Sequence, residues 1–152
     1  MVETIVSEGK LALADTDSLS AYLREVGRIR CLSRDGEKVL RERIARGDRA
    51  ARNELVASNL RLVVSVCRGF RGLGLPFADL IAEGNLGLVR AAQGFGLTRG
   101  RFAEYAEWWI RASVARAVEE QNRFRGLSAI PQIREPIRRE SDERQENRPD
   151  RG

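Results

Sequence analysis

Apolar residues recur at intervals of three and four along most of the chain, which is the spacing of one face of an α-helix. The first such stretch begins after Asp17 or Ser18, either of which can act as its N-cap. Ser33 and Asp48 can cap the next two stretches, and Gly47 lies where the second would end. No stretch alternates with a period of two, so strands are not expected. The pattern predicts an all-α protein.

Helices are expected over residues 17–29, 34–46, 48–70, 77–92 and 102–121. Two glycines and Pro76 interrupt the chain after the third stretch, which reads as one long helix. We expect these helices to form a single compact domain over residues 17–123, of the helical-bundle type. A flexible segment is expected at 1–16 and a charged, largely disordered tail at 124–152, with at most a short helix near 133–139.

The composition is that of a globular protein, with 42% hydrophobic residues and no apolar run of the roughly 18 residues that a membrane helix needs. The start of the chain lacks the basic-then-apolar layout of a signal peptide, so a cytoplasmic location is expected. The absence of histidine excludes His-based zinc sites and Ser-His or Cys-His nucleophile pairs. No other cluster indicates an enzyme, a metal or a cofactor. Cys31 and Cys67 are interpreted as small core residues in a reducing compartment.

The aromatic residues are concentrated late in the chain. Five of the nine fall within a short window and have arginines around them: Phe95, Phe102, Tyr105, Trp108 and Trp109, with Arg99, Arg101, Arg111 and Arg116. Neighbouring helical residues point about 100° apart, so the two tryptophans cannot both enter one core. Aromatic faces among arginines suit the stacking of unpaired bases, and a net charge of +5 is compatible with a polyanionic partner. Core packing combined with a protein-binding surface is the alternative.

A second unusual segment, residues 75–89, interleaves polar and apolar residues and contains Gly84 and Gly87. Each glycine costs roughly 1 kcal/mol against alanine inside a helix. Such glycines suit a helix that another helix backbone approaches closely, or a surface left bare for a partner. Tight packing within the chain is the other interpretation, and from the residues alone it is the preferred one.

Together these segments resemble the sigma-70 family of transcription initiation factors. The resemblance runs from about Asp17 to Arg123 and is carried, in order, by SLSAYLREVGRI, LSRDGEKVLRERIARGD, ARNELVASNLRLVVSV, RGLGLPFADLIAEGNLGLVRAAQGF and FAEYAEWWIR. It implies a non-enzymatic protein, covering regions 1.2 to 2.4 of the family, that binds core RNA polymerase and promoter DNA. No segment resembles the parts that follow the melting helix, regions 3 and 4, so a chain without them is expected.

The resemblance also implies roles for individual residues. A coiled coil of the largest polymerase subunit would bind Asp79, Ala82, Asn85 and Val89. The single-stranded non-template strand of the −10 element would bind Arg99, Phe102, Tyr105, Trp108, Trp109, Arg111 and Arg116. Within that set, Phe102 and Tyr105 would receive a flipped adenine, with Arg99 assisting, and the tryptophans would support the upstream edge of the bubble. A second base pocket would involve Glu37, Asn59 and Leu62, and the discriminator would be met by Tyr22, Leu23, Arg24 and Glu25.

The chain departs from the family pattern at several of these places. Ala112 and Ala115 replace residues that hydrogen-bond base edges, so major-groove readout should be lost there. Glu104 and Glu107 place carboxylates on the helix that would face phosphates. Ala82 and Gly96 replace polar residues usual in the family, and the link before Phe102 is one residue short.

Two functions follow from this comparison, and a third interpretation stays open. The first is a sigma factor that binds core polymerase and melts the −10 element. The alternative is a truncated sigma-like regulator that docks on core polymerase and competes with or modulates full-length sigma factors without productive promoter reading. The third is a degenerate fragment without selected activity.

Overall fold

The structure, a computed structural model, describes residues 16–126 of the chain as α-helices and one 3-10 turn, with no strand among them. In order these are α2 (Thr16–Gly27), α3 (Arg34–Ala45), α4 (Arg49–Ser58), α5 (Leu60–Arg68), α6 (Phe77–Gly94), η1 (Phe95–Leu97) and α7 (Phe102–Phe124). The predicted all-α class is confirmed. The segment 1–15 and the tail from 127 onward, with the helix expected near 133–139, lie outside the described residues.

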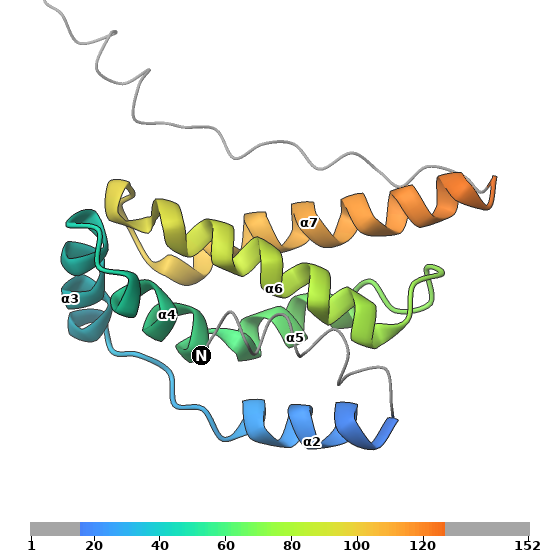
Figure 1. Ribbon diagram of the computed structural model, residues 1–152, viewed down its shortest axis with the longest axis horizontal. Coiled ribbons are helices and arrows are strands. Elements are labelled where there is room, and N and C mark those ends of the chain that lie inside the picture. Colours follow the sequence, from blue (N-terminus) through green and yellow to red (C-terminus); the bar gives the residue numbers. More distant parts are fainter. Residues whose placement is uncertain (1–15, 127–152) are drawn as a thin grey trace, which may run out of the picture.

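Figure 1 shows a layered arrangement in which α6 and α7, the two longest helices, run side by side. α4 and α5 pack against α6, and α5 also contacts α7. α2 lies beyond α5, and α3 closes one end of the bundle. The α6–α7 contact is the most extensive between any two helices, and buried residues of α4, α5, α6 and α7 form one core. Helix α7 is therefore supported along one side and open on the other.

The predicted caps at Ser33 and Asp48 are confirmed. The Ser33 Oγ accepts a hydrogen bond from the Gly36 N–H at 3.1 Å, and an Asp48 carboxylate oxygen accepts from the Ala51 N–H at 3.3 Å. Each satisfies an amide at the first turn of a helix. The Arg43 guanidinium, 2.8 Å from Asp48, holds the pKa of that carboxyl below its ordinary value and keeps it an acceptor.

The single helix predicted over 48–70 is wrong, because the chain breaks at Asn59 between α4 and α5. The Ser58 Oγ donates to the Glu54 carbonyl at 2.7 Å, and the Asn59 Nδ2 donates to the Leu55 carbonyl at 2.8 Å. These side chains bond to carbonyls of the preceding turn, which favours a bend in the helix. The apolar face continues across the break, which is why periodicity alone did not reveal it.

Gly84 and Gly87 lie on the buried side of α6. A Cβ on Gly84 would lie 2.7 Å from Cγ1 of Val63 on α5. A Cβ on Gly87 would lie 2.6 Å from the Trp109 carbonyl oxygen and 2.8 Å from the Ser113 Oγ, both on α7. The packing interpretation of these glycines is confirmed, because they let α5 and α7 approach the α6 backbone.

The two cysteines occupy different environments. Cys67 is fully buried, and its Sγ donates to the Leu80 carbonyl at 3.3 Å. Cys31 is exposed in the link between α2 and α3, so its assignment to the core is wrong. Cys31 lies outside any helix, so no helical face directs its side chain toward the core.

Alkylation should separate the two thiols. Burial raises the pKa of the Cys67 thiol to about 12, which keeps it protonated at neutral pH, and the thiolate is the reacting form. Iodoacetamide at pH 7.5 should therefore modify Cys31 in the native protein and reach Cys67 only in denaturant. Peptide mass mapping would identify the modified site. Rapid native labelling of Cys67 would contradict the buried position.

No helix in the described range 16–126 combines the length and apolar character needed to cross a membrane. Across the same residues, no three His, Cys, Asp or Glu side chains gather as metal ligands would.

Candidate nucleic-acid interface

Three aromatic residues of α7 form what we call the aromatic cluster: Tyr105, Trp108 and Trp109. Tyr105 and Trp109, four residues apart, meet edge to face with ring centroids 6.3 Å apart, and the rings of Trp108 and Trp109 are 5.2 Å apart at 85°. All three side chains are partly exposed. Tyr105 and Trp109 also pack against the hydrophobic core, and Trp109 supports the Trp108 ring.

The end of α6 shapes the seat of this cluster. A Cβ on Gly94 would lie 2.8 Å from the Tyr105 hydroxyl oxygen. The absence of a side chain at Gly94 therefore lets the Tyr105 hydroxyl approach the α6 backbone. The Trp109 backbone lies against Gly87, which precedes Gly94 by about two turns of α6 on nearly the same face. Small residues on α6 therefore set how deeply the ring-bearing turn of α7 sits in the bundle.

Phe102 lies in the core and not at the surface. Its ring is 0% exposed and packs edge to face on the equally buried Phe95, with centroids 4.8 Å apart. Phe102 shares one face of α7 with the buried Ala106 and Ile110, at intervals of four residues. A base could reach the Phe102 ring only if the core opened, so the prediction that it receives a flipped adenine does not fit this structure.

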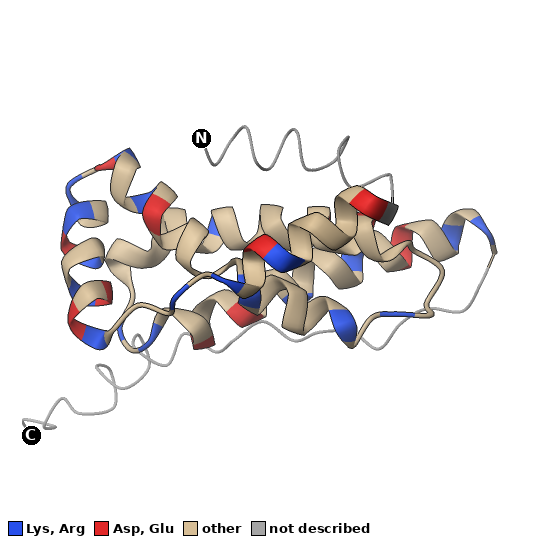
Figure 2. Ribbon diagram, turned by 90° about the horizontal axis from the view of Figure 1, so that it is seen from below, with Lys and Arg blue, Asp and Glu red and all other residues tan. Residues whose placement is uncertain are grey.

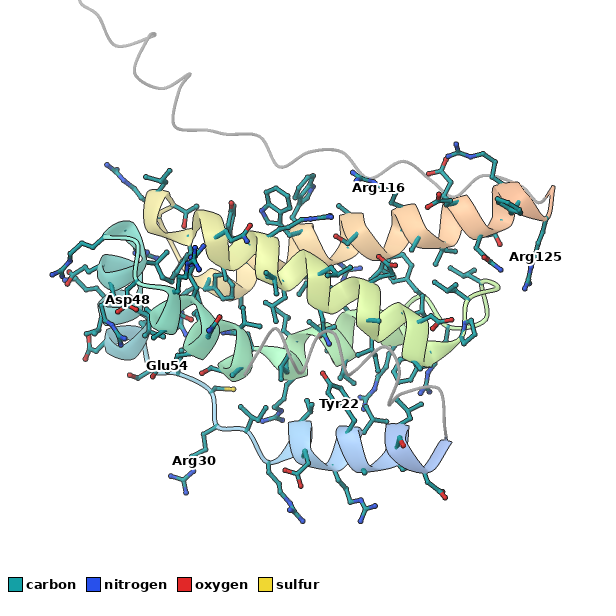
Figure 3. The ribbon with its side chains drawn as sticks, viewed as in Figure 1. Tyr22, Arg30, Asp48, Glu54, Arg116 and Arg125 are labelled. Atoms are coloured by element: carbon teal, nitrogen blue, oxygen red, sulfur yellow. The ribbon has the colours of Figure 1, made fainter. Side chains whose placement is uncertain are left out.

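The predicted arginines differ in their surroundings. Arg111 is bound to Glu107 through two hydrogen bonds of 3.0 and 2.8 Å, so the carboxylate expected to repel phosphate is paired. Arg116 is exposed, has no ion pair with residues 16–126, and points away from the bundle in Figure 3. Arg99 is exposed in the turn before α7. Figure 2 shows basic and acidic positions interspersed, without one continuous basic face in that view.

Glu37 is the buried member of the predicted second pocket, at 5% exposure. Its carboxylate accepts hydrogen bonds from Arg101 at 3.1 and 3.3 Å and from the Phe102 N–H at 3.4 Å. Asn59 uses its amide at the α4–α5 break, and Leu62 is partly buried against the core. Of the three residues predicted for a second base pocket, Glu37 thus uses its carboxylate and Asn59 its amide N–H group within the chain. Arg101 was not predicted as Glu37's partner, because no sequence signal links positions 64 residues apart.

The predicted discriminator residues divide between two faces of α2. Tyr22 and Leu23 pack against the core, whereas Arg24 and Glu25 are exposed. Figure 3 shows Tyr22 rising from α2 toward the layer above it, where its hydroxyl accepts a hydrogen bond from Asn85 Nδ2 at 3.2 Å. Burial raises the pKa of Tyr22 above its ordinary value. Only Arg24 and Glu25 are placed to meet a ligand directly.

Two of the four predicted polymerase-binding residues are covered by the chain. Ala82 is 8% exposed, and Asn85, which α2 covers through Tyr22, is 2% exposed. Asp79 is exposed and Val89 partly so. A direct polymerase contact through Asn85 therefore does not fit the described structure, because its side chain faces α2.

The exposed residues of α6 form a stripe that is rotated slightly about the helix axis from the predicted polymerase-binding residues. We call it the α6 stripe, and it consists of Asp79, Glu83, Leu86 and Arg90, spaced by four, three and four residues. Leu86 is 40% exposed, a large apolar side chain between two acids and a base. Leu86 was not predicted as a site residue, because spacing alone does not reveal which element packs against each face of α6.

Ala112 and Ala115 lie further along α7. Ala112 is partly buried and Ala115 is buried at 9% exposure, and neither carries a polar side chain. Glu104, by contrast, is exposed in the first turn. These two alanine positions therefore supply no base-reading group.

The fold and the two surfaces define a small helical binding module, with an aromatic cluster on one helix and a mixed polar–apolar stripe on its neighbour. Residues 17–50 match the family described as Sigma-70 factor, region 1.2, and residues 55–124 match the one described as Sigma-70 region 2. The chain belongs to the sigma-70 family, as the resemblance predicted.

Individual relatives agree with this assignment. The chain is 46% identical over 112 residues to RNA polymerase sigma factor SigA of Clostridium acetobutylicum, an alignment that covers 73% of this chain and 30% of that protein. It is 45% identical over 108 residues to SigA of a Bacillus species and 44% identical over 108 residues to SigA of Listeria monocytogenes; both alignments cover 70% of this chain and 29% of the relative. The chain thus spans less than a third of the length of these relatives.

Proposed function

We propose that this protein acts in transcription initiation by binding core RNA polymerase and holding unpaired bases of the promoter −10 element. The observation that carries the proposal is the partly exposed aromatic cluster on α7 in a chain of the sigma-70 family. Flipping a base out of the duplex costs a few kcal/mol, and stacking on an aromatic ring offsets about 1–3 kcal/mol per base. Melting by capture in this way needs no ATP and no catalytic residue.

Trp108 is the residue of the cluster best suited to meet a base. Its ring is partly exposed and braced by Trp109, which itself packs against the core. The nearby cations Arg99 and Arg116 would meet the phosphates. A braced ring loses little freedom on binding, so more of the stacking energy is available to hold the base.

The α6 stripe is the proposed polymerase surface. Asp79 and Glu83 offer charge and Leu86 offers exposed apolar area, which suits docking against a helical partner such as the coiled coil of the largest subunit. This surface lies on a different helix from the aromatic cluster, so the two ligands could be bound together.

A regulatory function is the second candidate, and the state of the DNA surface favours it. Glu107 pairs with Arg111, Glu104 is exposed, and Ala112 and Ala115 carry no hydrogen-bonding groups. A chain that kept the polymerase dock but read promoters poorly would compete with or modulate full-length sigma factors.

Two binding measurements on the full chain test these functions. Core polymerase pull-down reports docking, and fluorescence anisotropy with a single-stranded −10 oligonucleotide reports base capture. Binding of both supports the initiation factor, and binding of polymerase alone supports the regulator. A folded sample that binds neither would contradict both and favour the degenerate-fragment interpretation.

Replacement of Asp79 with alanine should weaken polymerase binding by about 1–2 kcal/mol, because Asp79 is an exposed charge at one end of the α6 stripe. Asp35→Ala is the matched control, since Asp35 is likewise an exposed acid in the first turn of a helix, α3. Surface plasmon resonance on immobilised core polymerase would measure both. Equal losses for the two variants would point to helix stability and not to docking.

A further inference from the structure

The first turn of α7 is held by another helix. Its N-cap residue, Arg101, makes no capping hydrogen bond with its side chain. The Phe102 N–H instead donates to a carboxylate oxygen of Glu37 on α3, and the same carboxylate accepts two hydrogen bonds from Arg101. Glu37 thus performs the function of an N-cap residue from a position 65 residues away.

A second residue of α3 holds the turn that leads into α7. Arg41 donates a hydrogen bond to the Gly100 carbonyl, and its guanidinium lies 4.5 Å from the centroid of the Phe95 ring. Gly96 packs against the Ala45 backbone, where a Cβ would come within 2.8 Å. Residues of α3 therefore contact this turn at its beginning and at its end.

The burial of Glu37 indicates a geometric role. A buried ion pair is weak evidence of stabilisation, because desolvation of the charges opposes their attraction, but its fixed hydrogen bonds specify position. All three hydrogen bonds of Glu37 go to Arg101 and Phe102, at the first turn of α7. Tyr105, the first residue of the aromatic cluster, follows in the next turn.

We propose that Glu37 and Arg41 form a clamp that sets the start of α7 and thereby positions the aromatic cluster for base capture. They are positioning residues, since Glu37 is buried and acts through Arg101 and Phe102 and not by contact with a base. The clamp joins the part of the chain matching region 1.2 to the part matching region 2. Its effect on nucleic acid rests on the proposed function.

Glu37→Gln in the full chain tests the clamp, because glutamine keeps the size of the side chain and removes its charge. Hydrogen exchange at the Phe102 amide should become about fivefold faster, because the glutamine amide keeps only one acceptor oxygen and no charge, which weakens the helix cap. The near-UV circular dichroism of the tryptophans should change while far-UV helicity is kept. Oligonucleotide affinity should fall about three- to tenfold, because the rings of the aromatic cluster would no longer be held in a single orientation for stacking.

Glu119→Gln is the matched control, because it removes an exposed Glu–Arg pair of the same helix far from its start. It should leave all three readouts unchanged. Arg101→Lys, which keeps a cation facing Glu37, should retain more affinity than Arg101→Met. The double variant Glu37→Gln with Arg101→Met should lose no more than the larger single loss, because the two residues act as one unit.

A Glu37→Gln protein that melts at a lower temperature but keeps wild-type exchange at Phe102 and wild-type near-UV dichroism would overturn the clamp. Unchanged oligonucleotide affinity in that variant would overturn its positioning role. If the unaltered chain bound no oligonucleotide, the proposed base capture would fail instead, and the exchange and dichroism results would still decide whether the clamp exists.

Discussion

Trp108→Ala is expected to weaken binding of a single-stranded −10 oligonucleotide by about 1–3 kcal/mol, or roughly 5- to 150-fold. Alanine removes the ring surface on which a base would stack. It leaves the fold largely intact, because Trp108 is partly exposed and is not among the residues packed against the core. Tyr105→Ala should give a loss within the same range. Fluorescence anisotropy titrations at fixed salt would measure both affinities.

Phe124→Ala is the control for this prediction. Phe124 lies at the far end of the same helix and is 93% exposed, so it has the same kind of ring without the cluster. Its replacement should leave oligonucleotide affinity within experimental error. If Trp108→Ala and Tyr105→Ala also left affinity unchanged, base stacking on α7 would be ruled out and the regulatory function would gain support.

Gly87→Ala should lower the free energy of unfolding by about 1–2 kcal/mol. The added methyl would meet the Trp109 carbonyl oxygen at 2.6 Å and the Ile110 Cα at 3.0 Å, and backbone atoms cannot rotate away. Forcing two packed helices apart costs about 1–3 kcal/mol or more, against which alanine regains about 1 kcal/mol of helix propensity. Urea denaturation followed by circular dichroism would give the difference.

Gly27→Ala provides the comparison for Gly87. A Cβ on Gly27, at the end of α2, would meet no atom within 4 Å. That change should be neutral or slightly stabilising, because alanine reduces the freedom of the unfolded chain. Equal stability of the two variants would show that the α6–α7 contact is looser than described. Because the Trp109 backbone lies at this contact, Gly87→Ala should also disturb the aromatic cluster.

Local signals in the sequence were enough to predict most of the helices. Ser33 and Asp48 cap helices where expected, because a cap depends on a side chain and amides three residues away. The break at Asn59 was missed, since the apolar face of α4 continues into α5 and a side-chain bond to a carbonyl leaves no periodic signal. Prediction therefore succeeded where short-range chemistry and hydrophobic period agreed.

The candidate site was predicted less completely than the fold. The concentration of aromatic residues on α7 was evident, but Phe102 and Trp108 could not be assigned to core or surface without knowing which face α6 covers. Asn85 and Ala82 were expected at a surface, but both are buried, and Asn85 is hydrogen-bonded to Tyr22 of α2. Whether a residue is exposed depends on which neighbours pack against it, and those neighbours are distant in sequence.

By itself the sequence determined the all-α class, the family, the starts of α3 and α4 and the aromatic character of α7, because these depend on residue type, spacing and contacts within one turn. Only the tertiary structure decided which side of each helix is open. It brought Glu37 to the start of α7, covered Asn85 with Tyr22, and used the glycines of α6 for packing. Helix packing joins residues more than 60 positions apart, and no local pattern encodes that distance.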